Sequence, residues 1–580
     1  MERDWSNNVA NSTARRTYIK RTLVHGLLGL SFLGQASLLV AQNPQSGKHV
    51  LGDKGVVSSA HPLATEAGLE VLKSGGNAFS AAVAIATTLN VVEPMMSGIG
   101  GYGTILLYDA KEGKAWFLNP SGRIPRGVDS DQFRAPTPNF LENRRGAKAV
   151  STPGNVHAWE AMSNKYGNVK WSRLFDAAIR HAEEGYAISN RTAQIIKVSF
   201  PELPVHAQEF YGRAGAPIAV GEKLVQKDLA NTLRRIAYGG AKAFYEGGVA
   251  GAIDAEMKLR GGFLSAEDLR NDQAEWWDPI QIEFNGYQIV TASPPANAFD
   301  ALVRIGMMGE YDLSALEHNS AEYLHRFAEV TKHGFWVRLA YAGDPDIAPP
   351  PLQKLLSKQY WDEQTKKIDL SAASTFQPPL PSTQQGDHTT HFVVADRWGN
   401  VVSATQTLGN LFGSKIMPPG TGIWLNNSLE YCTFEPKGNP MDAHPGRRKL
   451  SGDCPTLIMK DSKPWAAIGT PGGHSIGQTI AQMVLNLVVF QMDIQQAITA
   501  PKISFIEPDV LAVEQDIPEL TRTKLQAMGH RVRLVRALGN AHGLVIEYDE
   551  RGTPARFFGG ADPRGEGVAR GYWVGESIDK

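Results

Sequence analysis

The segment 387–396, two thirds of the way along the chain, is the feature that most constrains this sequence. It places Thr389 and Thr390 at the start of a run of strand-forming residues, after a polar, proline-rich stretch with the character of a cleavage site. Taken alone, this segment is explained better by ordinary strand propensity than by catalysis. A threonine acts as its own general base only when its α-amino group is free, because an amine accepts the hydroxyl proton and an amide does not. Cleavage between His388 and Thr389 would therefore make Thr389 an N-terminal nucleophile.

The composition narrows the class of protein. A chain of 580 residues can bury a large core, and more than one lobe is expected. The net charge is -1, with both signs mixed along the chain, so the basic stripe of a nucleic-acid-binding protein is missing. The two cysteines, Cys432 and Cys454, could pair in an oxidising compartment or remain separate, and they do not make a disulfide scaffold.

The N-terminal segment has the layout of a bacterial export signal. The pair Arg15 and Arg16 precedes an apolar run at 23–40, which ends at Ala41 before a polar stretch. Paired arginines favour the route that exports folded proteins. The apolar run is rich in small residues and interrupted by Gln35, which favours cleavage over retention as a membrane anchor. We expect residues 1–41 to be a twin-arginine signal and the product to be periplasmic or secreted.

The rest of the chain alternates between helices and strands. A proline in the first turn and glycines at the end predict a helix at 62–73, and Asn77 caps a strongly apolar helix at 78–89. The middle, 171–355, reads as largely helical, and the chain becomes rich in strands after Thr389. Strands are expected at 104–108, 114–118, 392–395, 401–408, 456–459 and 465–469, with exposed connections at 349–351 and 377–385 and a helix at 475–490. Strands packed between helical layers predict an α+β sandwich.

Two local motifs carry little functional weight. Gly98, Gly100 and Gly103 match a dinucleotide-binding pattern, but they precede a strand instead of following one, so a packing role is expected. His388 and His391 have the spacing of metal ligands but no further ligands nearby. We therefore expect neither a metal nor a cofactor.

A third motif offers a rival nucleophile. Ser475 lies in a G-x-S-x-G pattern between a strand and a helix, as the nucleophile of an α/β-hydrolase requires. Residues that would complete the triad are Asp493 or Asp509, followed by His530 or His542. The preceding strands read as antiparallel hairpins, however, and the parallel strand–helix units of that fold are missing. The backbone N–H groups of Gly472 and Gly473 fit an oxyanion-binding turn better.

Several ordered blocks together resemble one family. The blocks are residues 75–78, 98–103, 389–391, 422–427, 455–456, 469–473, 559–564 and 571–572. On these blocks the chain, from about Gly52 to the C-terminus, is similar to the γ-glutamyltransferase (γ-glutamyltranspeptidase, glutathione hydrolase) family of N-terminal-nucleophile hydrolases. The resemblance implies a four-layer αββα sandwich, built from a precursor that cleaves itself into a large subunit (42–388) and a small subunit (389–580) that stay together as a heterodimer.

The resemblance also implies catalytic roles. Thr389 would be the nucleophile both in self-cleavage and in turnover. Thr407 matches the threonine that hydrogen-bonds the nucleophile and tunes it, and Gly472 and Gly473 would supply the oxyanion hole. Attack of Thr389 on an amide gives an acyl-enzyme, which water or an amine resolves.

The substrate-recognition positions depart from the family pattern. The arginine that holds the substrate α-carboxylate aligns with Ser121, and Arg123 lies two residues later. Of the family's serine pair, Ser451 remains and Gly452 replaces the other. We take Ser451, Arg123 and Gly452 as candidate substrate-binding residues. A structural salt bridge is the alternative role for Arg123.

The positions that grip the substrate α-amino group have changed as well. They correspond to Gly409, Ser428 and Tyr431, with Glu430 next door. Glu430 is a further candidate for binding the substrate. The alternative interpretation is that Glu430 is a solvent-exposed acid on a loop, with no role in binding. The segment from Tyr431 to Ser451 is shorter than in the family's lid-bearing members and carries a possible anchor for an acidic acyl group in residues 447–449.

These departures leave more than one functional hypothesis. The first is an amidase that cleaves γ-glutamyl amides of the glutathione type, with hydrolysis favoured over transfer. The alternative is an acylase for glutaryl or other acyl groups without an α-amine, similar to cephalosporin acylases. A serine hydrolase using Ser475 and an inactive binding scaffold are the weaker readings. The expected partners are a small acyl amide and the two subunits of one precursor.

Overall fold

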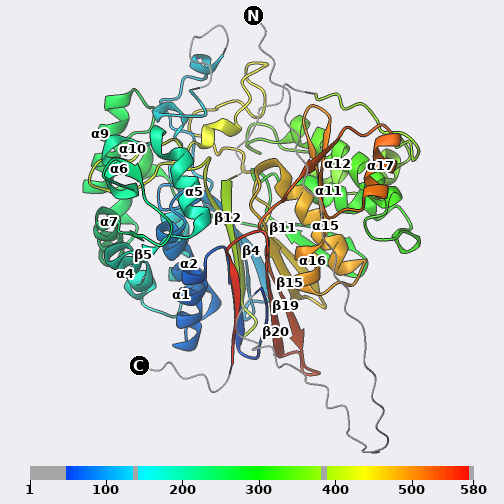
Figure 1. The fold of residues 1–580 in the computed structure, drawn as a ribbon, viewed down its shortest axis with the longest axis horizontal. Coiled ribbons are helices and arrows are strands. Elements are labelled where there is room, and N and C mark those ends of the chain that lie inside the picture. Colours follow the sequence, from blue (N-terminus) through cyan, green and yellow to red (C-terminus); the bar gives the residue numbers. More distant parts are fainter. Residues whose placement is uncertain (1–47, 135–141, 380–387, 574–580) are drawn as a thin grey trace, which may run out of the picture. The chain divides into compact units, whose positions relative to one another are not determined.

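The computed structural model describes residues 48–134, 142–379 and 388–573. The expected export signal lies outside these residues, as does most of the expected connection at 377–385. The described part contains two seven-stranded antiparallel sheets, which lie between two layers of helices (Figure 1).

The first sheet contains the strand that begins at the candidate nucleophile. Its order is β21 (Val568–Tyr572), β2 (Gly55–Ser59), β12 (His388–Asp396), β13 (Val401–Gly409), β3 (Tyr102–Asp109), β4 (Lys114–Asn119) and β9 (Glu275–Trp277). The strands expected at 104–108, 114–118, 392–395 and 401–408 are confirmed, and each is longer than its apolar core predicted. Strand β12 lies between β2 and β13, so chain on both sides of Thr389 builds one sheet.

The second sheet faces the first. Its order is β1 (His49–Gly52), β20 (Pro554–Ala561), β19 (His542–Tyr548), β15 (Lys463–Gly469), β14 (Thr456–Lys460), β11 (Tyr287–Thr291) and β10 (Ile280–Phe284). Side chains such as Val393 and Leu106 from the first sheet share one apolar cluster with Leu457 and Leu544 from the second. Alternate residues along each strand point to opposite faces, which is why one face enters this cluster and the other contacts helices.

Helices cover the outer face of each sheet. On the first, α1 (Pro62–Lys73) and α2 (Ala78–Val92) pack with Val394 and Val402, and every residue of α2 is buried. The predicted cap is present, because Asn77 Oδ1 accepts a hydrogen bond from the Ser80 amide at 3.0 Å. On the second sheet, α11 (Phe299–Met308), α12 (Ala321–Tyr341) and α15 (Ile476–Val488) pack with Ile458 and Ile468. The architecture is therefore the expected αββα sandwich.

The remaining elements surround this sandwich. The further helices are α3 (Asn155–Tyr166), α4 (Asp176–Glu184), α5 (Asn190–Ser199), α6 (Val205–Tyr211), α7 (Lys227–Gly239), α8 (Lys242–Tyr245), α9 (Gly248–Arg260), α10 (Ala266–Asn271), α13 (Leu352–Leu355), α14 (Lys358–Thr365), α16 (Ile494–Thr499) and α17 (Glu519–Ala527). A small sheet joins β16 (Ile503–Ile506), β17 (Val510–Glu514) and β18 (Val532–Val535). Two-residue strands pair β5 (Tyr186–Ala187) with β8 (Lys223–Leu224), and β6 (Gly212–Arg213) with β7 (Ala216–Pro217).

Two sequence questions are answered by this architecture. Cys432 and Cys454 are both buried free thiols and do not pair. Within the described ranges, no helix has the length and hydropathy needed to cross a bilayer.

Candidate active site

Thr389 lies at an irregular point of strand β12. The β12–β13 register pairs His388 with Gly409 but Thr390 with Gln406, so a bulge falls at Thr389. A bulge turns a side chain away from the regular alternation of the strand. The Thr389 side chain is 5% exposed, and its Oγ1 donates a hydrogen bond to Thr407 Oγ1 at 3.2 Å.

Thr407 connects Thr389 with the peptide bond expected to be cut. Its hydroxyl donates to the carbonyl oxygen of His388 at 2.9 Å and accepts from the amide of Gly409 at 2.8 Å. The carbonyl of the His388–Thr389 peptide bond is therefore polarised by the same hydroxyl that contacts Thr389. This arrangement fits an attack of Thr389 Oγ1 on its own preceding carbonyl.

The glycine turn after β15 faces the same cavity. Gly472 and Gly473 have φ values of +138° and +54°, conformations that disfavour any larger residue. A Cβ on Gly472 would lie 2.4 Å from Ser475 Oγ. Gly472 and Thr389 both line a cavity of about 590 Å³, so the backbone of this turn lies where an oxyanion-binding group would be needed.

The rival serine-hydrolase site is not assembled. Ser475 Oγ donates to the carbonyl oxygen of Gly472 at 2.8 Å. Of the two histidines that could complete its triad, His530 contacts His325 at 2.8 Å and His542 contacts Ser58 at 2.8 Å. Ser475 lines the cavity with Thr389, but the described contacts give it no histidine base.

Ser451 and Gly452 lie beside the glycine turn, without lining the described cavity. Ser451 is 1% exposed, and its Oγ is 3.4 Å from Thr104 Oγ1. A Cβ on Gly452 would lie 3.5 Å from the carbonyl oxygen of Gly473 and 3.3 Å from the ring of Tyr431. A side chain at position 452 would therefore be packed tightly against the Tyr431 ring, so glycine fits this position.

Arg123 belongs to an ion-pair cluster that does not line the described cavity. Its Nη2 is 2.6 Å from Glu275 Oε1, and Arg448 Nη2 is 3.1 Å from the same oxygen. The adjoining Asp272 is fully buried, and burial raises its pKa to about 6. The cluster joins the loop after β4 to the segment before β14.

Glu430 is a buried acid, so the interpretation of this residue as a solvated loop acid was wrong. It is 1% exposed, and it accepts a hydrogen bond from Asn410 Nδ2. Burial raises its pKa to about 8. A Cβ on Gly409 would lie 2.9 Å from Glu430 Oε1, which places this carboxyl beside the end of β13 that carries Thr407.

The other positions that correspond to the family's binding site for the substrate α-amino group make contacts within the protein. Ser428 is fully buried and donates to Ser151 Oγ. Tyr431 is 3% exposed and packs in the core beneath the second sheet. Gly409 adds no polar side chain, so Glu430 is the one acid among these neighbouring positions.

The three basic residues before Ser451 differ in their surroundings. Arg447 pairs with Asp346 at 2.9 Å and Arg448 with Glu275. Lys449 is buried, with its Nζ 3.4 Å from the ring centroid of Tyr102, and burial lowers its pKa. Since Tyr102 pairs with Thr407 across β3 and β13, Lys449 lies one side chain away from Thr407.

Sequence reasoning missed several residues that line the cavity with Thr389. They are Arg191 on α5, Glu507 after β16 and Arg533 on β18. A related contact is Thr390 Oγ1, which donates to the buried Glu93 at 2.7 Å. No local motif marks these residues, because elements far apart in the sequence bring them together.

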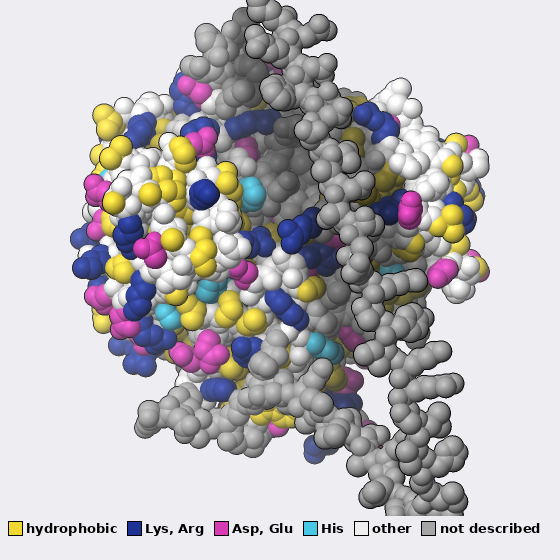
Figure 2. All heavy atoms as spheres, viewed as in Figure 1, with side chains coloured by type: hydrophobic (Ala, Val, Ile, Leu, Met, Phe, Trp, Pro, Cys, Tyr) yellow, Lys and Arg dark blue, Asp and Glu magenta, His cyan; other side chains and the backbone are white. Residues whose placement is uncertain are grey.

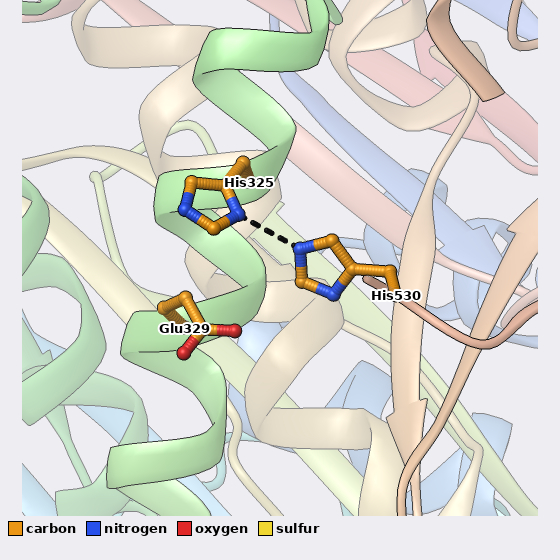
Figure 3. A group of neighbouring side chains, drawn as sticks. All are labelled: His325, Glu329 and His530. Carbon is orange, nitrogen blue, oxygen red and sulfur yellow. Dashed lines mark hydrogen bonds between the residues drawn. The ribbon is translucent and has the colours of Figure 1, made fainter. Parts of the chain in front are cut away.

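A histidine pair with a carboxylate lies elsewhere, between α12 and the segment that leads into β18. His325 Nδ1 and His530 Nε2 are 2.8 Å apart, and Glu329 is one helical turn from His325 (Figure 3). Glu329 accepts from Lys332 Nζ at 2.9 Å and from the Ser374 amide at 3.1 Å. These groups satisfy one another, and the Lys332 ammonium opposes a second cation.

Comparison with known proteins identifies the family. The αββα sandwich, with the candidate nucleophile Thr389 on an inner strand, has the fold of an N-terminal-nucleophile hydrolase. The γ-glutamyltranspeptidase family model matches residues 64–572, and the chain belongs to this family of enzymes.

Relatives of two kinds match almost the whole chain. The glutathione hydrolase proenzyme of Bacillus subtilis (strain 168) is 34% identical over 544 residues, covering 90% of this chain and 92% of the relative. The acylase ACY 1 proenzyme of Pseudomonas sp. (strain V22) is 32% identical, covering 88% and 95%. The crystal structure of cephalosporin acylase from Bacillus halodurans superimposes with a TM-score of 0.83 at 29% identity, covering 94% and 99%. Both kinds of relative therefore share the fold of this chain.

Proposed function

We propose that this chain is a proenzyme that cuts itself between His388 and Thr389. Thr389 Oγ1 attacks the His388 carbonyl carbon, and the peptide nitrogen leaves to give an ester. Water then hydrolyses the ester, which produces a carboxylate on His388 and a free α-amine on Thr389. The observation that carries this proposal is the hydrogen-bonded arrangement of Thr389, Thr407 and the His388 carbonyl.

The processed enzyme would cleave γ-glutamyl amides of the glutathione type. The α-amine of Thr389 takes the hydroxyl proton, and Oγ1 attacks the γ-carbonyl of the substrate. The amides of Gly472 and Gly473 stabilise the oxyanion, the amine product leaves, and a γ-glutamyl ester remains on Thr389. Water resolves this ester more readily than an acceptor amine, since the shortened segment before Ser451 leaves the site open. Thr407 keeps the nucleophile oriented.

Glu430 and the region around Ser451 would recognise the γ-glutamyl group. The buried carboxyl of Glu430 is the one acid beside the altered amine grip, and it would accept hydrogen bonds from the substrate α-amine. Arg123 and Lys449 are the nearby cations for the α-carboxylate, and each would have to exchange its present contacts for the substrate.

A second candidate function is supported by the filled amine grip. The α-ammonium of a γ-glutamyl group would lie next to Gly409, Ser428 and Tyr431. Each charge-assisted hydrogen bond that these residues cannot form weakens binding by about 1.5–3 kcal/mol. A glutaryl group has no α-amine and loses nothing at these positions. The relatives named as acylases make this alternative concrete.

The proenzyme would be exported from the cytoplasm. Residues 1–41 would direct the folded precursor out of the cytoplasm, and the large and small subunits would remain together in the periplasm or outside the cell. The interleaving of β12 between β2 and β13 favours a stable heterodimer, because separation would expose the centre of a sheet.

The first experiment is the intact mass of the purified, denatured protein. Two masses, one equal to residues 389–580, are expected. A single uncut mass would overturn the proposed self-processing. The processed enzyme is then assayed with γ-glutamyl-4-nitroanilide and glutaryl-4-nitroanilide. Faster cleavage of the γ-glutamyl compound supports the first function, and a strong preference for the glutaryl compound supports the acylase.

A further inference from the structure

The small sheet of β16, β17 and β18 forms one wall of the cavity that contains Thr389. Strand β17 joins the other two, with Ala512 paired to Ser504 on β16 and to Arg533 on β18. Directly paired residues share a face of a sheet, so Ser504 and Arg533 project from the same side. Both line the cavity that contains Thr389, together with Ile506 two residues beyond Ser504.

The cavity holds four charged side chains besides His388. Arg564 is fully engaged, since it pairs with Glu514 at 2.6 Å and with Asp562 at 3.1 Å and also donates to backbone carbonyls. Glu507 is the single acid on the described lining. Burial raises the pKa of Glu507 to about 7, and the neighbouring Arg338 partly offsets this shift.

Two arginines remain available to a ligand. The guanidinium of Arg533 forms no ion pair or hydrogen bond with any residue in the described ranges, and its side chain is exposed. The guanidinium of Arg191 likewise has no hydrogen bond within these ranges, although its charge acts on His388 and Glu93. In Figure 2, several Lys and Arg side chains lie near the middle of the visible face.

Apolar side chains share this cavity with the arginines. Phe335, Phe505 and Leu538 all line it. The residues at the family's acyl-recognition positions, such as Ser451 and Tyr431, are absent from the described lining. The cavity is therefore suited to the part of the substrate that leaves with the amide nitrogen, and it combines an apolar wall with positive charge.

We propose that Arg533, assisted by Arg191, binds a carboxylate on the leaving group of the substrate. This inference rests on the proposed amidase function and adds the class of amide that the enzyme prefers: an apolar or aromatic amine that carries an acid. A guanidinium holds a carboxylate through two parallel hydrogen bonds, which gives geometric selection as well as attraction. The apolar wall holds the body of the same group by burial.

The test compares two substrates that differ by one carboxylate. γ-Glutamyl-4-nitroanilide and γ-glutamyl-3-carboxy-4-nitroanilide share the acyl group and the bond that is cut. We expect the wild-type enzyme to have a higher kcat/KM for the carboxylated compound. In Arg533→Gln this preference should fall about fivefold, through loss of activity on the carboxylated compound alone. Arg533→Lys keeps the charge and should retain part of the preference.

A matched control removes the same charge outside the cavity. Arg531 is exposed, lies two residues before Arg533 and does not line the cavity, so Arg531→Gln should leave the preference unchanged. Arg191→Gln should lower the preference, and raised salt should lower it in the wild type.

The outcomes separate this inference from the proposed function. Suppose that both anilides are cleaved, but Arg533→Gln does not change the preference, or Arg531→Gln changes it equally. Either result overturns the inference, and the proposed amidase function still holds. If only glutaryl amides are cleaved, the corresponding glutaryl pair of anilides gives the same comparison. If Thr389 cleaves neither series, both the function and the inference are wrong.

Discussion

The hydroxyl groups of Thr389 and Thr407 lie 3.2 Å apart on neighbouring strands, with Thr389 as the donor. A hydroxyl can donate one hydrogen bond and accept two. Thr407 donates to the His388 carbonyl and accepts from Thr389 and the Gly409 amide, so its capacity is filled. Thr407 therefore donates no hydrogen bond to Thr389, whose lone pairs remain open for the proposed attack on the His388 carbonyl.

Replacement of the nucleophile tests the central assignment. Thr389→Ala should stay a single chain of full mass and show no amidase activity, because no hydroxyl remains to form the ester. Thr389→Ser retains a hydroxyl and should still be processed. Intact mass and anilide hydrolysis are the measurements. Processing or turnover by the alanine variant would show that Thr389 is not the nucleophile and would favour Ser475 instead.

Thr407 should act through the nucleophile. Thr407→Ala removes the donor to the His388 carbonyl, and we expect processing and turnover to slow by about 10²-fold. Thr407→Ser keeps the hydroxyl and should restore most of both rates. A time course of subunit formation measures the first rate. Equal rates for the alanine and serine variants would show that the hydroxyl has no role, and matching thermal unfolding curves would exclude misfolding.

The glycine turn should tolerate no side chain. In Gly472→Ala the new Cβ meets Ser475 Oγ at 2.4 Å, and the backbone φ of +138° is strained for alanine. The displaced amides should cost about 10²-fold in kcat, the size of effect seen when an oxyanion donor is lost. Gly215→Ala is the control, since Gly215 has a positive φ but open space around its Cβ position. A similar loss of kcat in both variants would contradict a specific role for the turn.

Tyr431 should help to decide between acyl groups. Tyr431→Asp introduces an acid at one of the positions that correspond to the family's grip on the substrate α-amino group. It should raise the ratio of γ-glutamyl to glutaryl hydrolysis by about fivefold, because an amine gains a charged partner. Tyr431→Phe tests the loss of the hydroxyl alone and should leave the ratio unchanged. The kcat/KM values of the two anilides are the readout. An unchanged ratio in a folded aspartate variant would remove this position from acyl recognition.

Acid should destabilise the fold through buried neutral histidines. Burial lowers the pKa of His542 from its ordinary 6.5 to about 3. At a pH between these two pKa values, His542 is protonated in the unfolded chain but neutral in the folded chain. The free energy of unfolding therefore falls as the pH falls. The slope is at most about 1.4 kcal/mol per pH unit for one histidine.

The variant His542→Gln isolates this contribution. Its unfolding free energy, measured by denaturant titration from pH 6 to pH 4, should fall less steeply than that of the wild type. His49→Gln removes an exposed imidazole and should keep the wild-type slope. Identical slopes for all three proteins would show that His542 does not contribute to acid sensitivity.

The sequence predicted part of the secondary structure, but it missed strands β10 and β11 in the segment read as largely helical. Periodicity and caps gave α1 to the residue, and they found the strands on both sides of Thr389, because alternating burial and terminal hydrogen bonds are local properties. Strand ends were underestimated, since β12 and β13 extend through polar residues that hydrogen-bond across the sheet. Thr389 was named from its motif block, and Thr407 only from its match to the family's second threonine.

The tertiary structure decided how the substrate region is arranged. Burial of Glu430, the engagement of Arg123 with Glu275, and the meeting of Arg191 and Arg533 in one cavity depend on contacts between residues far apart in the chain. The same holds for Ser475, whose motif has the right local form but whose candidate histidines pack elsewhere. Local sequence thus determined the strands around Thr389 and named it as the candidate nucleophile. Only the packing of the layers determined which charges face the cavity, because burial and pairing of charges are properties of the assembled core.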